Sequence, residues 1–387
     1  MDRIGIFESR YLKNACIALC IVLLFSVTAA AEPGVSGAEV VLGMSNALSG
    51  PASALGTGVK KGAMVYFDKV NAAGGVHGRR IRVISYDDGY EPKQTYSNTN
   101  KLIHQDKVFA LFGYVGTPTA KAIIPLINRE KVLFFGSFTG AEFLRSPVNK
   151  YIFNVRGSYF DEAEAQVEYL LRTRGAKKIG MFIQNDAYGL AVKGGVLKAL
   201  KKRDMDLAGE GAYERNTEDI DSGLAGLKKA NPDAVSMVGT YKAMAAFIKK
   251  AKAERFNPIF LNVSFVGTAA LIKELGAAGE GTLVTQVMPS PQDASLPIVA
   301  QFQADMKAAG HRELDYTDLE GYVDAIVFTE ILKKTGKNLS RESFINAAES
   351  LSVGLGGLKF VYTPRRHQAL DTVYMTKISD GRAVPVK

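Results

Sequence analysis

The sequence is poor in the side chains that carry covalent or metal chemistry. Its two cysteines, Cys16 and Cys20, lie near the N-terminus, and no nucleophile elbow or phosphate-binding P-loop is present. The four histidines are scattered without metal-ligand spacing: His77, His104, His311 and His367. These absences argue against a disulfide scaffold, a zinc site and a hydrolase built on a nucleophile–base pair. We therefore expect neither an enzyme nor a cofactor.

Long hydrophobic runs are also absent, apart from one short run near the N-terminus. Three basic residues precede an apolar stretch over residues 15–27, and Ala29, Ala30 and Ala31 follow it. This order is typical of a secretory signal peptide, so we predict residues 1–31 to be removed near Ala31 and the protein to reach the periplasm. The run is short for about 30 Å of hydrocarbon, which argues against a membrane anchor. A lipoprotein site at Cys20 is disfavoured because the bulky Leu19 precedes it.

The chain has a basic net charge of +9, of which +8 remains after the predicted cleavage. Its lysines fall in helical runs such as residues 198–203 and 249–252, which is typical of solvated helix faces. No aromatic residues interleave with them, so we do not expect nucleic-acid binding. The remaining 387 − 31 = 356 residues are long enough for about two domains, and 47% hydrophobic residues supply their cores.

Strand and helix patterns alternate along the chain in two successive runs. The first begins with a strand over residues 40–45 and an amphipathic helix over 56–71, and the second begins with a helix over 161–173 and a strand over 178–184. This pattern predicts an α/β fold with two similar doubly wound lobes whose sheets are parallel. We place lobe 1 at residues 39–155 and 287–360, and lobe 2 at 156–286 and 361–387. No flexible linker separates them, so strand crossovers at residues 154–159 and 285–289 form a hinge.

Hydroxyl groups follow several of the predicted strands. Ser49 follows the first strand, Thr117 follows a second, and Ser137, Phe138 and Thr139 follow a third. Ligands of parallel sheets bind beyond the carboxyl ends of the strands, and helix N-terminal amides attract anions there. The alternative is that each of these residues only caps a helix. Three such loops along one edge favour a binding site for a carboxylate or another anion.

An ordered set of short motifs covers almost the whole mature chain. It comprises LSGPASALG, NAAGGVHGRRI, YDDGYEPKQ, the Thr117 loop, the 137–139 loop, NDAYG and the Thr240–Tyr241 loop. With this set the chain resembles the periplasmic solute-binding proteins of the branched-chain amino acid receptor family, which have the type 1 periplasmic binding fold. The resemblance implies a monomeric receptor that closes two lobes on a small molecule and presents it to an ATP-driven (ABC) permease. A sensor that signals to a membrane partner remains an alternative.

The resemblance also implies ligand contacts. Thr117 matches the hydroxyl that meets the ligand carboxylate, the loop 137–139 matches the next contact, and Tyr188 and Tyr241 match the tyrosines that close from the second lobe. Three departures accompany these matches. Ser264 replaces an acidic residue that pairs with the ligand ammonium, Leu55 replaces a tyrosine, and Tyr90 with Gly116 replaces a disulfide pair.

The departure at Ser264 bears on the ligand. A buried ammonium without a carboxylate partner costs several kcal/mol. We therefore expect leucine, isoleucine and valine to bind weakly, and an acid or polar molecule without an ammonium to bind better.

Overall fold

The computed structural model describes residues 32–386, so the predicted signal peptide and both cysteines lie outside the described part. Among residues 32–386, no helix is long and apolar enough to span a bilayer. In the same range, no group of three or more potential metal-ligating side chains comes together.

The first sheet has five strands in the order β2-β1-β3-β4-β5, and all neighbouring pairs are parallel. Apolar side chains alternate between its two faces. Leu42 points to a core shared with Phe112 and Phe135, while its neighbour Val41 belongs to a separate core with Leu111. The strands are β1 (Glu39–Asn46), β2 (Arg80–Asp87), β3 (Ala110–Phe112), β4 (Leu133–Phe135) and β5 (Ile152–Phe153).

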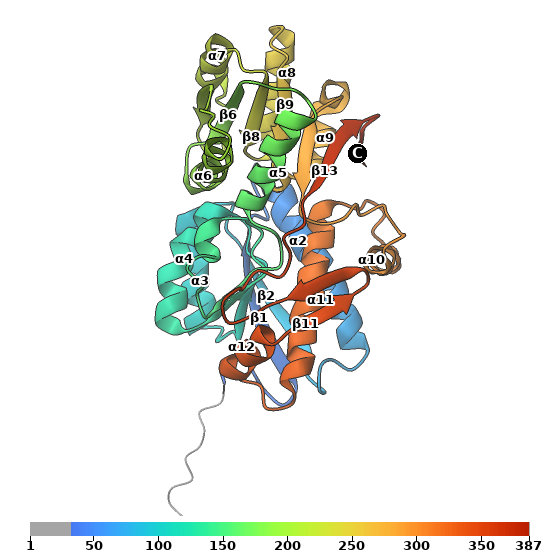
Figure 1. The fold of residues 1–387 in the computed structure, drawn as a ribbon. Coiled ribbons are helices and arrows are strands. Elements are labelled where there is room, and N and C mark those ends of the chain that lie inside the picture. Colours follow the sequence, from blue (N-terminus) through green and yellow to red (C-terminus); the bar gives the residue numbers. More distant parts are fainter. Residues whose placement is uncertain (1–31, 387) are drawn as a thin grey trace, which may run out of the picture. The chain divides into compact units, whose positions relative to one another are not determined.

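Helices cover both faces of this sheet and complete lobe 1 (Figure 1). Two helices pack together on one face, and the others contribute to the core on the opposite face. The pair is α3 (Pro92–His104) and α4 (Thr117–Glu130); the others are α2 (Ser53–Ala72), α10 (Pro297–Ala308), α11 (Tyr316–Thr335) and α12 (Arg341–Glu349). A hairpin of β11 (Ser352–Leu355) and β12 (Leu358–Val361), which the sequence pattern did not indicate, adds Phe360 to the same core.

The second sheet repeats the topology of the first and extends it. Its strands run in the order β14-β13-β10-β9-β8-β6-β7, and the five from β10 to β7 are parallel. Read in chain order, both parallel sets have the order 2-1-3-4-5. The strands are β6 (Ile179–Gln184), β7 (Gly209–Tyr213), β8 (Ala234–Val238), β9 (Ile259–Asn262), β10 (Leu283–Gln286), β13 (Tyr374–Ser379) and β14 (Arg382–Pro385).

Five helices accompany this sheet and form lobe 2 with it. Figure 1 shows them around β6, β8 and β9, with α5 on the side that leads to lobe 1. Helix α5 packs on α6, and α8 packs on α9. The helices are α5 (Tyr159–Arg172), α6 (Ala187–Lys201), α7 (Asp221–Ala230), α8 (Tyr241–Ala253) and α9 (Thr268–Leu275).

These sheets confirm the predicted α/β fold with two similar doubly wound lobes. One expectation needs correction, because β13 and β14 join the second sheet in antiparallel orientation. The predicted crossover at residues 154–159 also contains no regular strand, since β5 ends at Phe153, where the chain leaves the sheet and passes to lobe 2.

Three chain segments pass between the lobes, at residues 154–158, 287–296 and 362–373. The first and third run side by side, because the Asn154 amide donates to the His367 carbonyl at 2.8 Å and the Ala369 amide donates to the Asn154 carbonyl at 2.9 Å. The Leu370 amide adds a bond to the Val155 carbonyl. Paired extended segments of this kind permit rotation of two lobes while keeping their connection.

Glycines allow helix α2 to lie unusually close to α11. A Cβ on Gly62 would collide with the backbone oxygen of Asp318, and one on Gly58 would collide with the Thr317 side chain. The spacing Gly56-x-Gly58-x-x-x-Gly62 imitates a dinucleotide fingerprint, but here Gly58 and Gly62 face α11 and Gly56 lies against the backbone of Ala47.

Candidate functional site

Four of the site residues predicted on lobe 1, Thr117 and residues 137–139, lie beyond the carboxyl ends of β3 and β4. Thr117 is the first residue of α4, and Thr139 follows β4, where both side chains are fully buried. Their hydroxyl oxygens lie 2.6 Å apart, and the Thr139 hydroxyl lies 3.4 Å from that of Tyr159. The three hydroxyls form one cluster beyond the carboxyl ends of β3 and β4, the edge at which parallel α/β sheets bind ligands.

The other two residues of this loop have different surroundings. The Ser137 hydroxyl donates to the Tyr114 carbonyl at 3.4 Å and thereby ties the two loops together. The Phe138 ring packs against Phe265 of lobe 2, with ring centroids 5.3 Å apart. Phe138 thus lies at the boundary between the lobes.

Ser49 does not join the hydroxyl cluster. It is exposed, and its amide and that of Leu48 both donate to one carboxylate oxygen of Asp87, at 3.2 and 2.9 Å. The sequence suggested that these amides were free to bind an anion. In the structure the chain's own aspartate already occupies them, and these hydrogen bonds lower the Asp87 pKa despite the opposing effect of burial.

Both predicted tyrosines of lobe 2 reach the boundary between the lobes. Tyr188 lies near the start of α6, fully buried, with its ring 4.6 Å from Phe265 and 5.5 Å from Tyr159. Its hydroxyl has no hydrogen-bond partner among the described residues. Tyr241 begins α8, and its hydroxyl accepts from the Ala54 amide of lobe 1 at 3.4 Å.

Leu55 and the pair Tyr90–Gly116 form apolar contacts in the same region. A Cβ on Gly267 of lobe 2 would meet the Leu55 side chain, so Leu55 fills the space beside the backbone there. The Tyr90 ring rests directly on Gly116, whose positive φ of 111° also favours glycine. Where the resembling receptors carry a disulfide pair, this chain has an aromatic ring packed on a glycine.

Ser264 follows β9 and takes part in a buried polar cluster. Its amide and hydroxyl both donate to the Glu162 carboxylate, each at 2.8 Å, and its hydroxyl also contacts the Arg156 guanidinium. Arg156 is 1% exposed and pairs with Glu162 at 3.2 Å and with Glu320 at 3.4 Å. We call Arg156, Glu162, Ser264 and Glu320 the inner cluster.

The pKa values in the inner cluster depend on burial and on the positive charge of Arg156, the one cation of the cluster. Burial alone would lower the Arg156 pKa, but the Glu320 and Glu162 carboxylates outweigh it and raise the pKa. Burial raises the pKa of Glu320 to about 7, with Arg156 acting in the opposite direction and Glu162 adding to the rise. The pKa of the neighbouring Asp324 is raised for the same first reason, its burial.

Three members of the inner cluster were missed from the sequence. Arg156 follows the largely apolar residues 151–155, Glu162 falls in a polar helix pattern, and Glu320 lies between Leu319 and Gly321, two places after Asp318. A charged residue at the end of an apolar run was therefore the available signal at Arg156 alone, because unpaired charges are rarely buried. The aromatic residues Tyr90 and Phe265 were not predicted as site residues either.

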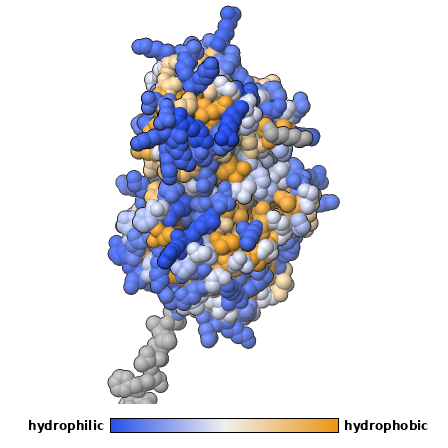
Figure 2. Space-filling view, in the orientation of Figure 1, coloured by the Kyte–Doolittle hydropathy of each residue, from blue (hydrophilic) through white to orange (hydrophobic). Residues whose placement is uncertain are grey.

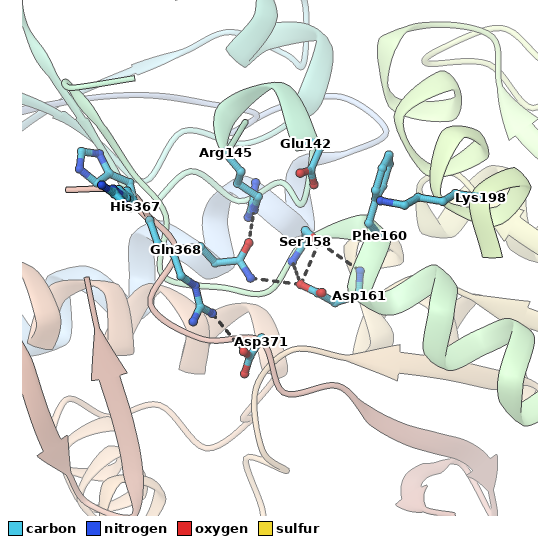
Figure 3. Close-up of a pocket in the computed structure, with 11 residues that line it drawn as sticks. Glu142, Arg145, Ser158, Phe160, Asp161, Lys198, His367, Gln368 and Asp371 are labelled. Atoms are coloured by element: carbon cyan, nitrogen blue, oxygen red, sulfur yellow. Dashed lines mark hydrogen bonds and ion pairs between the residues drawn. The ribbon is translucent and has the colours of Figure 1, made fainter. Parts of the chain in front are cut away.

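Two surface hollows lie apart from these residues. One, of about 360 Å³, is bordered by Arg145, Asp161 and Gln368 at the crossing segments (Figure 3). The other, of about 790 Å³, lies between α9, β14 and residues 290–293 and 313–316. None of the nine predicted site residues lines either hollow.

The predicted site is instead filled by side chains that belong to one apolar cluster drawn from both lobes. Leu55, Tyr90 and Phe138 of lobe 1 share this cluster with Tyr188 and Phe265 of lobe 2. Few large apolar side chains of the described chain are exposed, and Figure 2 shows apolar residues in separate patches on one face. The arrangement brings hydroxyls, aromatic rings and one arginine together at the boundary between the lobes.

Comparisons with known proteins agree with the fold. A family model described as a periplasmic binding protein matches residues 39–383. The leucine-specific-binding protein of Salmonella typhimurium is 26% identical over 73% of this chain and 76% of its own length, and the Leu/Ile/Val-binding protein of Escherichia coli is 26% identical over 75% and 78%. A solved structure titled as a possible leucine/isoleucine/valine-binding protein from Rhodopirellula baltica is 35% identical, covers 92% of this chain and 98% of its own, and superposes with a TM-score of 0.86.

Proposed function

The chain belongs to the periplasmic binding protein family, and we propose that it is an extracytoplasmic receptor that closes two lobes on a small polar or anionic solute. Proteins of this family are solute-binding proteins and not enzymes. The observation that carries the proposal is that the Thr139 hydroxyl and Phe138 ring of lobe 1 meet the Tyr159 hydroxyl and Phe265 ring of lobe 2, at a boundary spanned by three crossing segments.

We further propose that the receptor works in the periplasm as a monomer and delivers its solute to an ABC-type permease. Support comes from the relatives, whose names describe leucine- and branched-chain amino acid-binding proteins, and from the apolar N-terminal run that is typical of a signal peptide. The contact set proposed for the solute is Ser137, Phe138, Thr139, Thr117, Leu55, Tyr188, Tyr241 and Ser264. Ser49 is left out of this contact set, because its amide already donates to the Asp87 carboxylate.

A thermal-shift screen of the mature protein tests the proposal. The panel contains amino acids, carboxylic acids, amides and sugars, each at millimolar concentration. A ligand that binds only the folded state adds RT ln(1 + [L]/Kd) to the free energy of unfolding, about 2.7 kcal/mol at one hundred times Kd. We expect at least one small polar or anionic compound to raise the melting temperature in a concentration-dependent way. A panel without any such compound would contradict the receptor function.

A further inference from the structure

Two buried arginines lie next to the crossing segments, and they differ in how their donors are used. Arg145 donates to four backbone carbonyls and to the Gln368 side chain, at distances from 2.7 to 3.4 Å. Figure 3 shows its guanidinium directed at Gln368, which in turn donates to Asp161. Arg145 therefore holds the crossing segments together, and these hydrogen bonds account for its burial.

Arg156 makes its contacts with side chains, and one of its three donor nitrogens has no partner among the described residues. Its two terminal nitrogens pair with Glu162, Glu320 and Ser264, whereas its Nε–H has no partner among the described residues. The guanidinium lies over the Phe138 ring, 4.9 Å from the centroid, and near that of Tyr159 at 5.8 Å. Buried polar groups rarely lack a hydrogen-bond partner, so we expect an acceptor to bind this donor.

The Glu162 carboxylate, by contrast, has all of its hydrogen-bond acceptor positions in use. One carboxylate oxygen accepts from Arg156 and from the Ser264 hydroxyl, and the other accepts from the Ser264 amide and from Thr285 at 2.5 Å. A carboxylate has about four acceptor positions, and all four are used here. Glu162 therefore cannot also serve a ligand ammonium, although it lies where the sequence alone suggested that no carboxylate was present.

Two polar groups without partners in this region can each donate a hydrogen bond to an acceptor atom of a ligand. They are the Arg156 Nε–H and the Tyr188 hydroxyl, both fully buried. Around them stand the aromatic rings of Phe138, Tyr159 and Phe265. Tyr188 is one of the groups that act on the Arg156 charge, so the two donors belong to one neighbourhood. A carboxylate placed between them would accept from both, and charge-assisted hydrogen bonds to arginine are among the strongest in proteins. The rings provide an apolar or aromatic surface for the rest of such a molecule.

We propose that Arg156 and the Tyr188 hydroxyl bind the carboxylate of a small apolar or aromatic acid that has no ammonium group. This inference rests on the proposed receptor function and names the class of solute that the same site takes. The Thr117–Thr139 hydroxyl pair lies near this position, since both contact Tyr159, whose ring lies beside that of Tyr188.

Titration calorimetry of the mature protein with four matched probes tests the class of ligand. 4-Methylpentanoate is leucine without its ammonium, 4-methylpentanamide is the neutral analogue, phenylacetate has an aromatic body, and leucine itself completes the set. We expect one or both acids to bind at least about 10- to 150-fold more tightly than the amide and leucine. If leucine binds most tightly, the receptor function stands and the carboxylate inference is overturned. If neither acid exceeds the amide, the inference is also overturned.

Two variants then test the named residues with the better-binding acid. Arg156→Lys keeps a cation but removes Nε–H and the planar fork, and should weaken binding of the acid about 10-fold or more while leaving the amide unaffected. Arg145→Lys is the matched control, since it changes another buried arginine and should lower the melting temperature without changing the preference for acid over amide.

Tyr188→Phe supplies an independent test that does not disturb a buried charge. It removes only a hydroxyl that has no partner in the structure, so the protein should fold at least as well as the parent. We expect binding of the acid to weaken about 10-fold or more. Unchanged acid affinity in Tyr188→Phe, or equal loss of acid and amide binding in Arg156→Lys, would refute the assignment.

Discussion

Two of the places where polar side chains join the lobes differ in burial. The inner cluster is inaccessible to solvent, and Arg156 and Glu162 within it are at most 1% exposed. At the rim of the boundary, Arg215 of lobe 2 pairs with Glu91 of lobe 1 at 2.7 Å, and Asn216 donates to the same carboxylate at 2.7 Å. There the Glu91 side chain is 47% exposed and that of Arg215 is 23% exposed. We call this second group the rim bridge.

Ion pairs of similar composition should differ in what the loss of one partner costs, depending on whether they are buried or exposed. Water can replace either partner of the rim bridge, so removing one side costs little and salt screens the attraction. In the inner cluster no water replaces a lost partner, and the remaining charge stays buried. We therefore expect the loss of a partner in the inner cluster to cost far more stability than the loss of a partner in the rim bridge.

The largest expected effect is at Glu162. Glu162→Ala leaves Arg156 buried with only the weaker Glu320 contact and removes four hydrogen bonds. We expect the free energy of unfolding to fall by about 3–5 kcal/mol, measured by urea denaturation. Glu91→Ala in the rim bridge is the control. Equal losses in the two variants would remove the distinction between the two regions.

A smaller effect is expected at Thr117, beside the inner cluster. Thr117→Val removes the hydroxyl that lies 2.6 Å from Thr139. If this hydroxyl also contacts an anionic ligand, affinity should fall by about 1.5–3 kcal/mol, and stability by only about 0.5–1.5 kcal/mol. Thr119→Val is the control, because the Thr119 hydroxyl donates to two carbonyls of its own helix turn. Ligand calorimetry that shows the same affinity for Thr117→Val and the parent would make Thr117 a packing residue only.

The pH dependence of the free energy of unfolding is a further property that depends on the inner cluster. Burial raises the pKa of Glu320 to about 7, so the folded state binds a proton more tightly than the unfolded chain. Stability from this group is present at low pH and is lost as pH rises from about 4.5 through 7. Asp318, whose pKa burial also raises to about 7, contributes with the same sign.

Urea denaturation at a series of pH values checks this expectation. Glu320→Gln should flatten the decline between about pH 5 and 8, leaving the part that belongs to Asp318 and Asp324. Charged and titratable groups that act on Glu320 are Arg156, Glu162, Arg145 and Asp324. A slope in Glu320→Gln identical to that of the parent would show that Glu320 does not titrate in this range.

The smallest effect is expected at the rim bridge. Glu91→Gln keeps the size of the side chain and removes its charge, so the closed form should lose about 0.2–1 kcal/mol. This change should appear as a weaker affinity for the ligand at low salt and should shrink at 0.5 M salt. A loss that is large and independent of salt would mean that the rim bridge behaves like a buried pair.

Sequence patterns predicted the parts of the molecule that depend on local periodicity. The alternation of strands and helices gave both sheets, and hydroxyls after strands located Thr117 and Thr139, because the carboxyl ends of parallel strands share one edge. The inner cluster could not be predicted in the same way. Arg156, Glu162 and Glu320 come together only through the path of the crossing segments and α11, which no local pattern specifies. The antiparallel strands β13 and β14 likewise depend on that path.

Small-angle X-ray scattering of the mature protein, with and without the compound that raises its melting temperature most, tests the central claim directly. The central claim is that two lobes close on a small solute at their boundary. Because closing brings the lobes together around the hinge, the radius of gyration should fall when the ligand saturates the protein. An unchanged radius of gyration, with calorimetry confirming saturation in the same sample, would contradict it.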